Sequence, residues 1–479
     1  MERTEQSQLE KLNLQAAHKL DPTLFPKLSH LEDSDYLRNF GIFIPGKEEL
    51  PQGFLRLYAS DFIVEEIDST GQVLTIERPT ELTSPPSRDP SNESHRALFA
   101  TLVKCNISTH EVVREMAAKL DCPVENIRYA GLKDKHAITA QTISFHNIST
   151  EKIASLPPSA HYFLKDWRWD KGSMDRGGLK GNRFTLFIRT PQPVQSQNFL
   201  DLEKQLSKQG FYNFYYLQRF GVPRLINFQW GFEILRGHYQ ECVTSFLTES
   251  NERELPFFSQ LREKIRGLIP DWSAIRKLLE PYPLIMHNEI RLIEALQANN
   301  GDYLKALVAM PDQTMLWVYA FASLLFNEQL TRLIQTNKQI PEFLPLLLSP
   351  DPQDLASYRE LLSVVGGWPL DFKNLRPFKH IYIQKRKIQT KEKISIEQSS
   401  FSPEGVGLRF SLNKGEYATT FLAHLFNIIS GSPPAELSSA TEIDTAALMG
   451  NNSNHGTLDY FRQVNFDKNS SFLDDNSNI

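Results

Sequence analysis

Apolar residues along this chain follow two different periods, which separate a first half of mixed strands and helices from a later helical stretch. Short runs rich in Phe, Leu, Val and Ile at 54–66 and 97–108 predict β-strands. The segment 110–121 repeats apolar residues every four positions after a Ser-Thr pair, which predicts a capped helix. Between about 225 and 370 most segments have the helical period, so we expect a separate helix-rich unit there.

Outside these segments the pattern is less regular. Strand character returns at 405–426, where a Gly-marked turn leads into a predicted helix. Residues 1–45 form a polar, weakly amphipathic stretch, and the Ser/Pro/Thr-rich run at 79–95 predicts a surface loop. The Asn/Ser-rich, acidic segment that follows residue 431 predicts a flexible tail.

Composition places the chain among globular proteins with more than one core. It has 479 residues, of which 41% are hydrophobic and 11% aromatic, and a single core stops growing at roughly 250–300 residues. No run approaches the roughly 20 apolar residues of a membrane span, and the charged N-terminus lacks a signal core, so we expect a cytoplasmic protein. The 3 Cys and 12 His show no ligand spacing, so we expect neither a metal nor another cofactor.

The net charge of −5 opposes nucleic-acid binding at first sight, because an RNA partner favours a basic surface. The acidic excess is concentrated near the two ends of the chain. The segment 373–393 carries eight Lys or Arg against one Glu, which forms a local basic stripe. Such a stripe can contact RNA or can be an ordinary solvated surface.

A charged turn at 131–136 is the sharpest candidate for chemistry. It lies between two strand-like stretches in IRYAGLKDKHAITAQTISF, and Asp134 is at its apex between Lys133 and Lys135. A nearby cation favours the ionised form of a carboxylate, which makes Asp134 a candidate nucleophile or base. The two lysines could also hold phosphates. A plain surface turn built by Gly and Asp is the alternative.

The motif AGLKDKHAITAQ resembles the signature of the TruD family of tRNA pseudouridine synthases, a GxKD turn followed by a basic residue and a short strand. Other motifs of the family follow in the same order around it, over roughly residues 52–425. They are DFIVEE (61–66), KGNRFTLFIR (180–189), NFYYLQRFG (213–221), SLLFN (323–327) and KGEYATTFL (414–422).

The resemblance implies roles for particular residues. It implies that Asp134 is the catalytic nucleophile, and that Asn182 and Phe184 bind the uracil edge and stack on a flipped-out uridine. Arg56 stands where the family usually has Lys, so we expect it near the site, with an ion pair to Asp134. A second departure is Tyr216, at a position where relatives usually have Gly.

The resemblance also implies an α+β fold, with a pseudouridine synthase core of largely antiparallel sheet flanked by helices and an inserted helix-rich TruD domain. The expected parts are an N-terminal extension (1–50), the catalytic domain (51–210 and 391–430), the insertion (211–390) and the tail (431–479). We expect an RNA partner, most often tRNA in this family, modified at uridine 13 of the D arm. No membrane and no obligate protein partner are implied.

Two other functions are compatible with parts of this pattern. A catalytically inactive RNA-binding protein or chaperone could keep the fold and the stacking residues without the chemistry. A glycoside-type hydrolase would need a second carboxylate at a fixed separation from Asp134, and Glu66 could supply one only if the fold brought it close.

Overall fold

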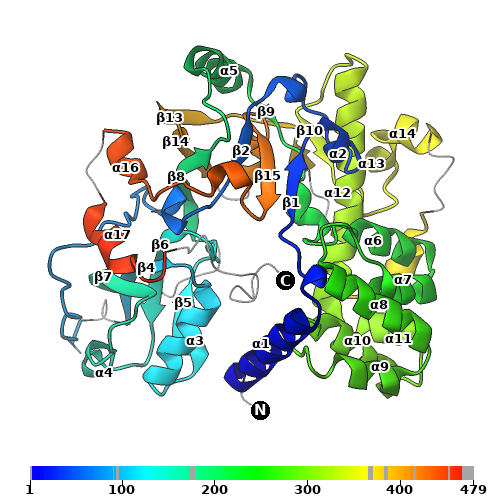
Figure 1. The fold of residues 1–479 in the computed structure, drawn as a ribbon, viewed down its shortest axis with the longest axis horizontal. Coiled ribbons are helices and arrows are strands. Elements are labelled where there is room, and N and C mark those ends of the chain that lie inside the picture. The colour runs from blue at the N-terminus through cyan, green and yellow to red at the C-terminus, as the bar shows by residue number, and fades with distance from the viewer. Residues whose placement is uncertain are drawn as a thin grey trace. The chain divides into compact units, whose positions relative to one another are not determined.

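The computed structural model describes residues 3–89, 91–92, 96–172, 178–364, 370–381, 387–413, 417–450 and 454–465. The chain divides into two compact units (Figure 1). Unit 1 combines Met1–Glu48 with Tyr212–Glu392, and unit 2 combines Glu49–Phe211 with Lys393–Asn469. Unit 1 is mainly helical and unit 2 is built on a sheet, so the chain is α+β, as expected. None of the described helices is long and apolar enough to cross a membrane.

Unit 2 is organised around a mixed, largely antiparallel sheet. Its main path runs β15-β2-β8-β3-β6-β4-β7, and β14 pairs with both β8 and β13. β3 runs parallel to β6, and β15 runs parallel to β2. The strands are β2 (Gln52–Phe54), β3 (Phe62–Asp68), β4 (Ala97–Cys105), β5 (Ile127–Tyr129), β6 (Ile138–Phe145), β7 (Tyr162–Asp170), β8 (Leu179–Arg189), β13 (Ser395–Ser402), β14 (Gly405–Asn413) and β15 (Asn427–Gly431).

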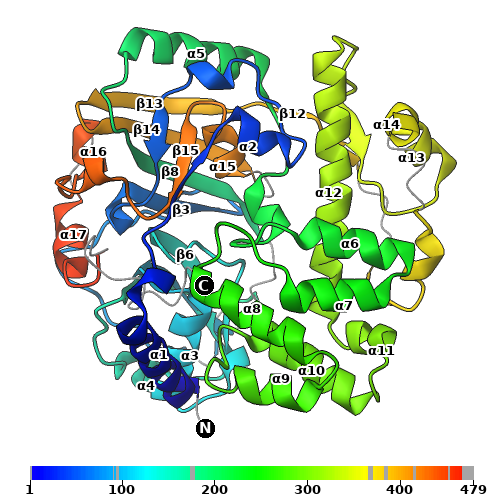
Figure 2. The same ribbon diagram turned by 45° about the vertical axis from the view of Figure 1, so that its right-hand side comes forward.

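Helix α3 (Thr109–Lys119) packs on one face of this sheet, which we call the α3 face. The helix begins at Ser108, whose hydroxyl accepts a hydrogen bond from the Glu111 amide, while the Glu111 carboxylate accepts one from the Ser108 amide. Apolar side chains of α3 then pack on Leu98 and Leu102 of β4. Elsewhere in the unit, helix α5 (Ser196–Gln209) lies along β13 (Figure 2).

The C-terminal segment packs on the opposite face, which corrects the expectation of a flexible tail from residue 431. Two short helices form there, α16 (Thr445–Leu448) and α17 (His455–Phe461). Leu458 and Phe461 are buried among side chains of β3, β4 and β6. The polar composition did not predict α17, because only two of its apolar residues, three positions apart, are buried in the existing core. Residues 466–479 lie outside the described part.

Unit 1 packs its helices around α12 (Pro311–Gln335), a 25-residue helix with many buried side chains. Helix α6 (Asn227–Arg236) lies against it at Gly231, where a Cβ atom would stand 2.1 Å from the carbonyl oxygen of Trp317. This close approach requires glycine. Other helices of the unit are α1 (Arg3–Leu20), α2 (Ser34–Arg38), α7 (Tyr239–Thr248), α8 (Pro256–Leu268), α9 (Trp272–Leu279), α10 (His287–Ala298), α11 (Tyr303–Val308), α13 (Pro352–Ala356) and α14 (Arg359–Val364).

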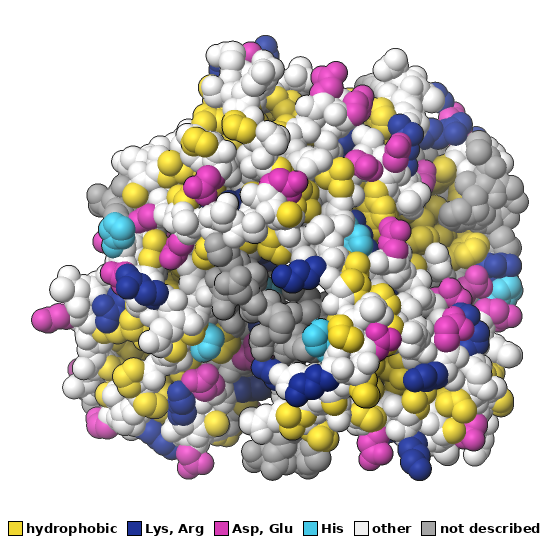
Figure 3. Space-filling model, viewed as in Figure 1, with side chains coloured by type: hydrophobic (Ala, Val, Ile, Leu, Met, Phe, Trp, Pro, Cys, Tyr) yellow, Lys and Arg dark blue, Asp and Glu magenta, His cyan; other side chains and the backbone are white. Residues whose placement is uncertain are grey.

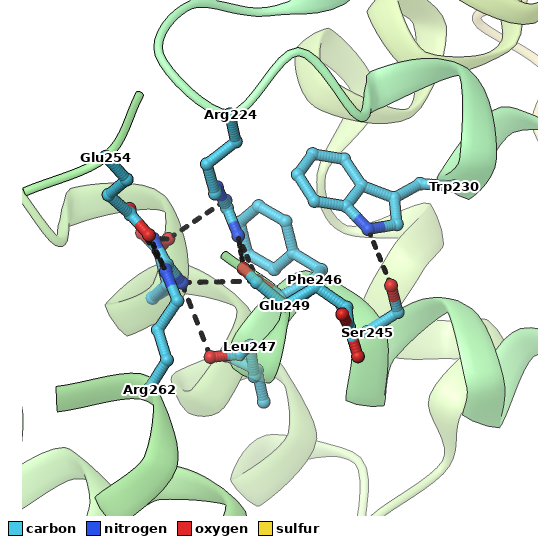
Figure 4. A network of polar contacts seen from close by, with 9 residues as sticks. Arg224, Trp230, Ser245, Phe246, Leu247, Glu249, Glu254 and Arg262 are labelled. Atoms are coloured by element: carbon cyan, nitrogen blue, oxygen red, sulfur yellow. Dashed lines mark hydrogen bonds and ion pairs between the residues drawn. The ribbon is translucent and has the colours of Figure 1, made fainter. Parts of the chain in front are cut away.

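Two arginines and two glutamates form a buried network among these helices (Figure 4). Arg262 of α8 pairs with Glu254 at 2.9 Å and with Glu289 of α10 at 3.1 Å, and Arg224 pairs with Glu289 at 3.3 Å. Both guanidinium groups also donate to the carbonyl oxygen of Phe246 in α7. The network therefore ties α7, α8 and α10 to the loop that carries Arg224.

Of the predicted N-terminal extension (1–50), residues 1–48 cluster with unit 1. In α1, the Glu10 carboxylate accepts hydrogen bonds from two main-chain amides that precede α10. The Tyr216 hydroxyl donates to the buried Glu32 carboxylate at 2.6 Å, and Arg253 pairs with Glu32 at 3.2 Å. Tyr216 has φ −86°, so the residue that replaces the family's usual glycine needs no left-handed backbone. It instead anchors the N-terminal segment.

The basic segment 373–393 is only partly described, because residues 382–386 lie outside the described ranges. Within it, Lys391 lies 4.7 Å from the centre of the Tyr212 ring, close enough for a cation–π contact. Over the helices of unit 1 that are visible in Figure 3, Lys and Arg side chains stand among Asp and Glu. The charge on that face of unit 1 is therefore mixed.

Candidate active site

Asp134 lies in the loop between β5 and β6, which are antiparallel neighbours. Hydrogen bonds hold this loop to the sheet and to α3. The Gln141 side chain on β6 donates to the Gly131 carbonyl at 3.1 Å and accepts from the Thr109 hydroxyl at 2.8 Å. The Thr109 hydroxyl in turn accepts from the Lys133 amide at 3.3 Å. The main chain that leads into Asp134 is thus fixed by side chains of two neighbouring elements.

The Asp134 carboxylate is paired with Arg56, as the sequence led us to expect. Arg56 Nη2 lies 2.7 Å from Asp134 Oδ1, and the two side chains are 30% and 36% exposed. Arg56 has φ +68°, which is uncommon for a residue with a side chain. Its guanidinium carbon lies 4.0 Å from the centre of the Phe62 ring. The arginine is therefore held on two sides, and the carboxylate remains accessible to a ligand.

Three phenylalanines on neighbouring strands form a row of ring contacts that begins at Arg56. The ring of Phe184 on β8 meets Phe62 on β3 edge-on, with centroids 6.2 Å apart. Phe184 also stacks on Phe410 of β14, with centroids 5.3 Å apart and an interplanar angle of 18°. Phe184 is only 7% exposed. Phe62 contacts both Arg56 and Phe184. Phe184, the aromatic residue predicted for the site, therefore lies in the same cluster as Arg56, the partner of Asp134.

Asn182 lies two residues before Phe184 on β8, opposite Glu66 of β3. Its Oδ1 atom is buried and has no hydrogen-bond partner among the described residues. A buried acceptor without a partner is costly, which makes this oxygen a candidate contact for a bound ligand. At the preceding residue, Gly181, a Cβ atom would lie 2.2 Å from the Leu412 carbonyl oxygen, so glycine permits the close pairing of β8 with β14.

The two lysines that flank Asp134 differ in their surroundings. Lys133 Nζ lies 2.9 Å from Glu66 Oε2, in a pair whose side chains are 4% and 2% exposed. Glu66 also accepts a hydrogen bond from the Thr142 amide. Lys133 thus points into the protein, whereas Lys135 is partly exposed. Because Glu66 is ion-paired with Lys133, it does not serve as the second carboxylate that a glycoside-type hydrolase would need beside Asp134.

Sequence reasoning did not find Lys104, which lies directly behind the loop. Its side chain is completely buried at the end of β4, and its Nζ donates to the main-chain carbonyl of Asp134 at 2.6 Å. Burial lowers the pKa of Lys104 to about 8, although the nearby Asp134 charge acts in the opposite direction. The available signal was a lysine inside ALFATLVKC, a strand that is otherwise apolar apart from one threonine.

Together these residues combine an accessible carboxylate and arginine fork with a buried amide oxygen and a buried aromatic cluster. Such a set can attack an electrophilic carbon, bind the edge of a planar heterocycle and pack against its face. Among the described residues, no group of three or more His, Cys, Asp or Glu side chains is placed to hold a metal ion.

Comparison with known proteins gives a consistent result. The sequence model of tRNA pseudouridine synthase D (TruD) matches residues 46–345. Probable tRNA pseudouridine synthase D 1 of Methanocaldococcus jannaschii is 27% identical over 387 residues, which are 77% of this chain and 94% of that protein. The tRNA pseudouridine synthase D of Aquifex aeolicus is 25% identical over 241 residues, 50% of this chain and 60% of that protein.

A solved structure shares the fold. The crystal structure described as tRNA pseudouridine synthase D from Methanosarcina mazei has a TM-score of 0.61 at 21% identity, and the match covers 81% of this chain and 97% of that one. Fold and sequence motifs together define an isomerase of the pseudouridine synthase class. The chain belongs to the TruD family of tRNA pseudouridine synthases. The predicted family and fold class are thereby confirmed.

Proposed function

We propose that this chain converts uridine to pseudouridine in tRNA, most specifically at uridine 13 of the D arm, with Asp134 as the nucleophile. The observation that carries the proposal is the accessible Asp134 carboxylate held 2.7 Å from Arg56 at the apex of the family's motif loop. Family membership supplies the reaction class. The tRNA substrate is that named for the relatives, and the position comes from the family resemblance.

The reaction is an isomerisation, so atoms and electrons balance without a co-reactant. The N1–C1′ bond breaks, the uracil rotates in place, and a C5–C1′ bond forms as the C5 proton leaves and N1 gains a proton. A single carboxylate can act by adding to C1′ or to the uracil ring. Water must be kept from C1′ in the intermediate state, because its capture would leave an abasic site.

The residues around Asp134 suit the binding of a flipped-out uracil. Asn182 presents a buried carbonyl oxygen that could accept the N3–H of the base, and its amide could donate to a uracil carbonyl. We assign Phe184 to the face of the base, where stacking contributes roughly 1–3 kcal/mol. Because Phe184 is 7% exposed and stacked on Phe410, this contact requires the ring to be uncovered when the base binds. Lys135, partly exposed beside the nucleophile, is the lysine that we assign to a backbone phosphate. We assign Lys133, with its buried partner Glu66, to supporting the loop.

The experiment is incubation of the purified chain with tRNA transcripts, followed by chemical labelling of pseudouridine and primer extension. A transcript with uridine 13 and a matched transcript with cytidine at that position are compared. Pseudouridine at position 13 of the first and none in the second supports the full proposal. Modification at another uridine leaves the reaction standing and overturns the position. Binding without any modification, in transcripts or total cellular RNA, favours an RNA-binding protein without catalysis.

A further inference from the structure

Lys104 is a buried lysine that donates a hydrogen bond to the main chain of the proposed nucleophile. Lys104 is the next-to-last residue of β4, between Val103 and Cys105. The side chains of Val103 and Cys105 lie on the face of the sheet opposite α3, where they pack near α17. The Lys104 side chain therefore projects onto the α3 face, where its Nζ reaches the Asp134 carbonyl at 2.6 Å. A short contact of this kind is typical of a charge-assisted hydrogen bond.

A buried ammonium group is costly, and the fold keeps this one against the loop of interest. Lys104 is 0% exposed, and water is replaced by the loop carbonyl and by nearby charges. Among these charges, Asp134 and Glu111 favour the ammonium, and Lys133 opposes it. A methionine of similar length would fill the same space without this cost. What distinguishes Lys104 from an ordinary buried lysine is that its hydrogen bond holds the Asp134 main chain.

We propose that Lys104 is a positioning residue for catalysis. It fixes the main chain at the apex of the loop, while Arg56 fixes the carboxylate of Asp134. The inference rests on the proposed role of Asp134. The Lys104 hydrogen bond holds the main chain of Asp134, and the Arg56 ion pair holds its side chain. With both ends fixed, the carboxylate approaches the substrate in one geometry. A misplacement of about 1 Å can cost about 100-fold in rate.

The same sheet contains a matched lysine for comparison. Lys165 of β7 is also buried, at 6% exposure, and its Nζ donates to the Glu77 main-chain carbonyl at 2.7 Å. Its partner is not in the Asp134 loop. Replacement of either lysine by methionine removes a buried ammonium and its hydrogen bond to a carbonyl. Only the Lys104 replacement should change the chemistry.

The test compares Lys104→Met, Lys104→Arg and Lys165→Met in the full-length chain with a tRNA transcript that wild type modifies. We measure the single-turnover rate constant, the Kd for tRNA and the thermal unfolding midpoint. Lys104→Met should lower the rate constant about 100-fold with Kd changed less than about threefold. Lys104→Arg should be about tenfold faster than Lys104→Met and therefore about tenfold slower than wild type. Lys165→Met should lower stability and leave the rate constant within about twofold.

The pH profile separates positioning by charge from mere filling of space. The charged groups that act on Lys104 are Asp134 and Glu111, which favour its ammonium form, and Lys133, which opposes it. Because burial lowers the pKa of Lys104 to about 8, the ammonium loses its proton as the pH rises through that value. The wild-type rate should then fall above about pH 8, and this fall should be absent in Lys104→Arg, whose guanidinium stays protonated.

The outcomes distinguish this inference from the proposed function. If wild type forms no pseudouridine, the proposed function fails first. If wild type is active and Lys104→Met keeps a rate constant within about threefold, the positioning role is overturned. An equal loss in Lys104→Met and Lys165→Met that follows their unfolding midpoints also overturns it. If Lys104→Met does not fold, the Lys104→Arg profile decides, because an unchanged fall above pH 8 would contradict the role.

Discussion

Each unit of the molecule holds arginines paired with carboxylates, and the two clusters are built in opposite ways. In unit 1, the network of Arg224, Arg262, Glu254 and Glu289 is closed, with every side chain at most 10% exposed. In unit 2, the pair of Arg56 and Asp134 is open, with about a third of each side chain exposed. The first cluster joins helices (Figure 4), and the second presents a carboxylate.

The two clusters show how structural charges differ from reactive ones. In the closed network both guanidinium groups donate to glutamates and to main-chain carbonyls, so the charges satisfy one another. Burial lowers the pKa of Arg224 to about 10, which still leaves it charged at neutral pH. In the open pair, the surroundings instead restrain the partner, since Arg56 is held by the Phe62 ring and an uncommon backbone conformation. Restraint together with access is what a nucleophile needs.

The largest effect on stability should follow from breaking the closed network. Glu289→Ala leaves Arg224 and Arg262 without a shared partner inside unit 1, which should lower the free energy of unfolding by about 3–5 kcal/mol. Urea denaturation measures the change. Glu294→Ala on the same helix removes an exposed pair with Arg276 and should cost less than about 1 kcal/mol. Similar losses in the two variants would contradict the distinction between closed and exposed pairs.

The next effect concerns the open pair and should appear in the rate. Arg56→Met should lower the single-turnover rate constant about 100-fold, or about 2.7 kcal/mol in the barrier, because the carboxylate loses its orienting partner. Arg56→Lys keeps the charge without the fork and should lose about tenfold. Arg183→Met removes the Glu65 pair from the other face of the sheet and should leave the rate within about twofold. An Arg56→Met enzyme as fast as wild type would refute this role.

The smallest effect concerns Lys47, a buried lysine of unit 1. Burial lowers the pKa of Lys47 to about 7, despite the nearby carboxylates of Glu32 and Asp33. The folded protein therefore releases this proton near pH 7, whereas the unfolded chain keeps it to about pH 10.4. Stability should consequently rise with pH across that window, and the contribution of Lys47 should be about 1 kcal/mol between pH 7 and 8.

The measurement is the difference in unfolding free energy between wild type and Lys47→Met at pH 7 and pH 8. The variant should lack the Lys47 part of the rise, whereas Lys19→Met, which removes an exposed lysine of α1, should behave as wild type. Parallel pH curves for wild type and Lys47→Met would show that Lys47 does not titrate in this range.

Local patterns in the sequence predicted much of unit 2. The strand at 97–108 and the capped helix after it are β4 and α3, and the charged turn at 131–136 is the loop that carries Asp134. Order and motif identity also led to Arg56, whose ion pair with Asp134 spans 78 positions of the chain. The motifs made that distant pairing predictable, because local periodicity contains no information about it.

What the sequence did not reveal depends on contacts between distant segments. Lys104 lay hidden in an apolar strand, because only the fold shows that its side chain ends at the Asp134 carbonyl. The flanking lysines looked equivalent, yet the strand register that places Glu66 near the loop buries Lys133. Likewise, the polar tail gave no sign that Phe461 would fill a gap on the back of the sheet.

Whether the Asp134 carboxylate performs the chemistry is tested by single-turnover pseudouridine formation with Asp134→Asn. Asparagine keeps the size of the side chain and removes its charge. The control is Asp121→Asn, an exposed carboxylate of the same unit. We predict that Asp134→Asn binds tRNA with a Kd within about threefold of wild type and loses at least about 1,000-fold in rate, while Asp121→Asn is unchanged. Pseudouridine formation by Asp134→Asn within about tenfold of the wild-type rate would contradict the account.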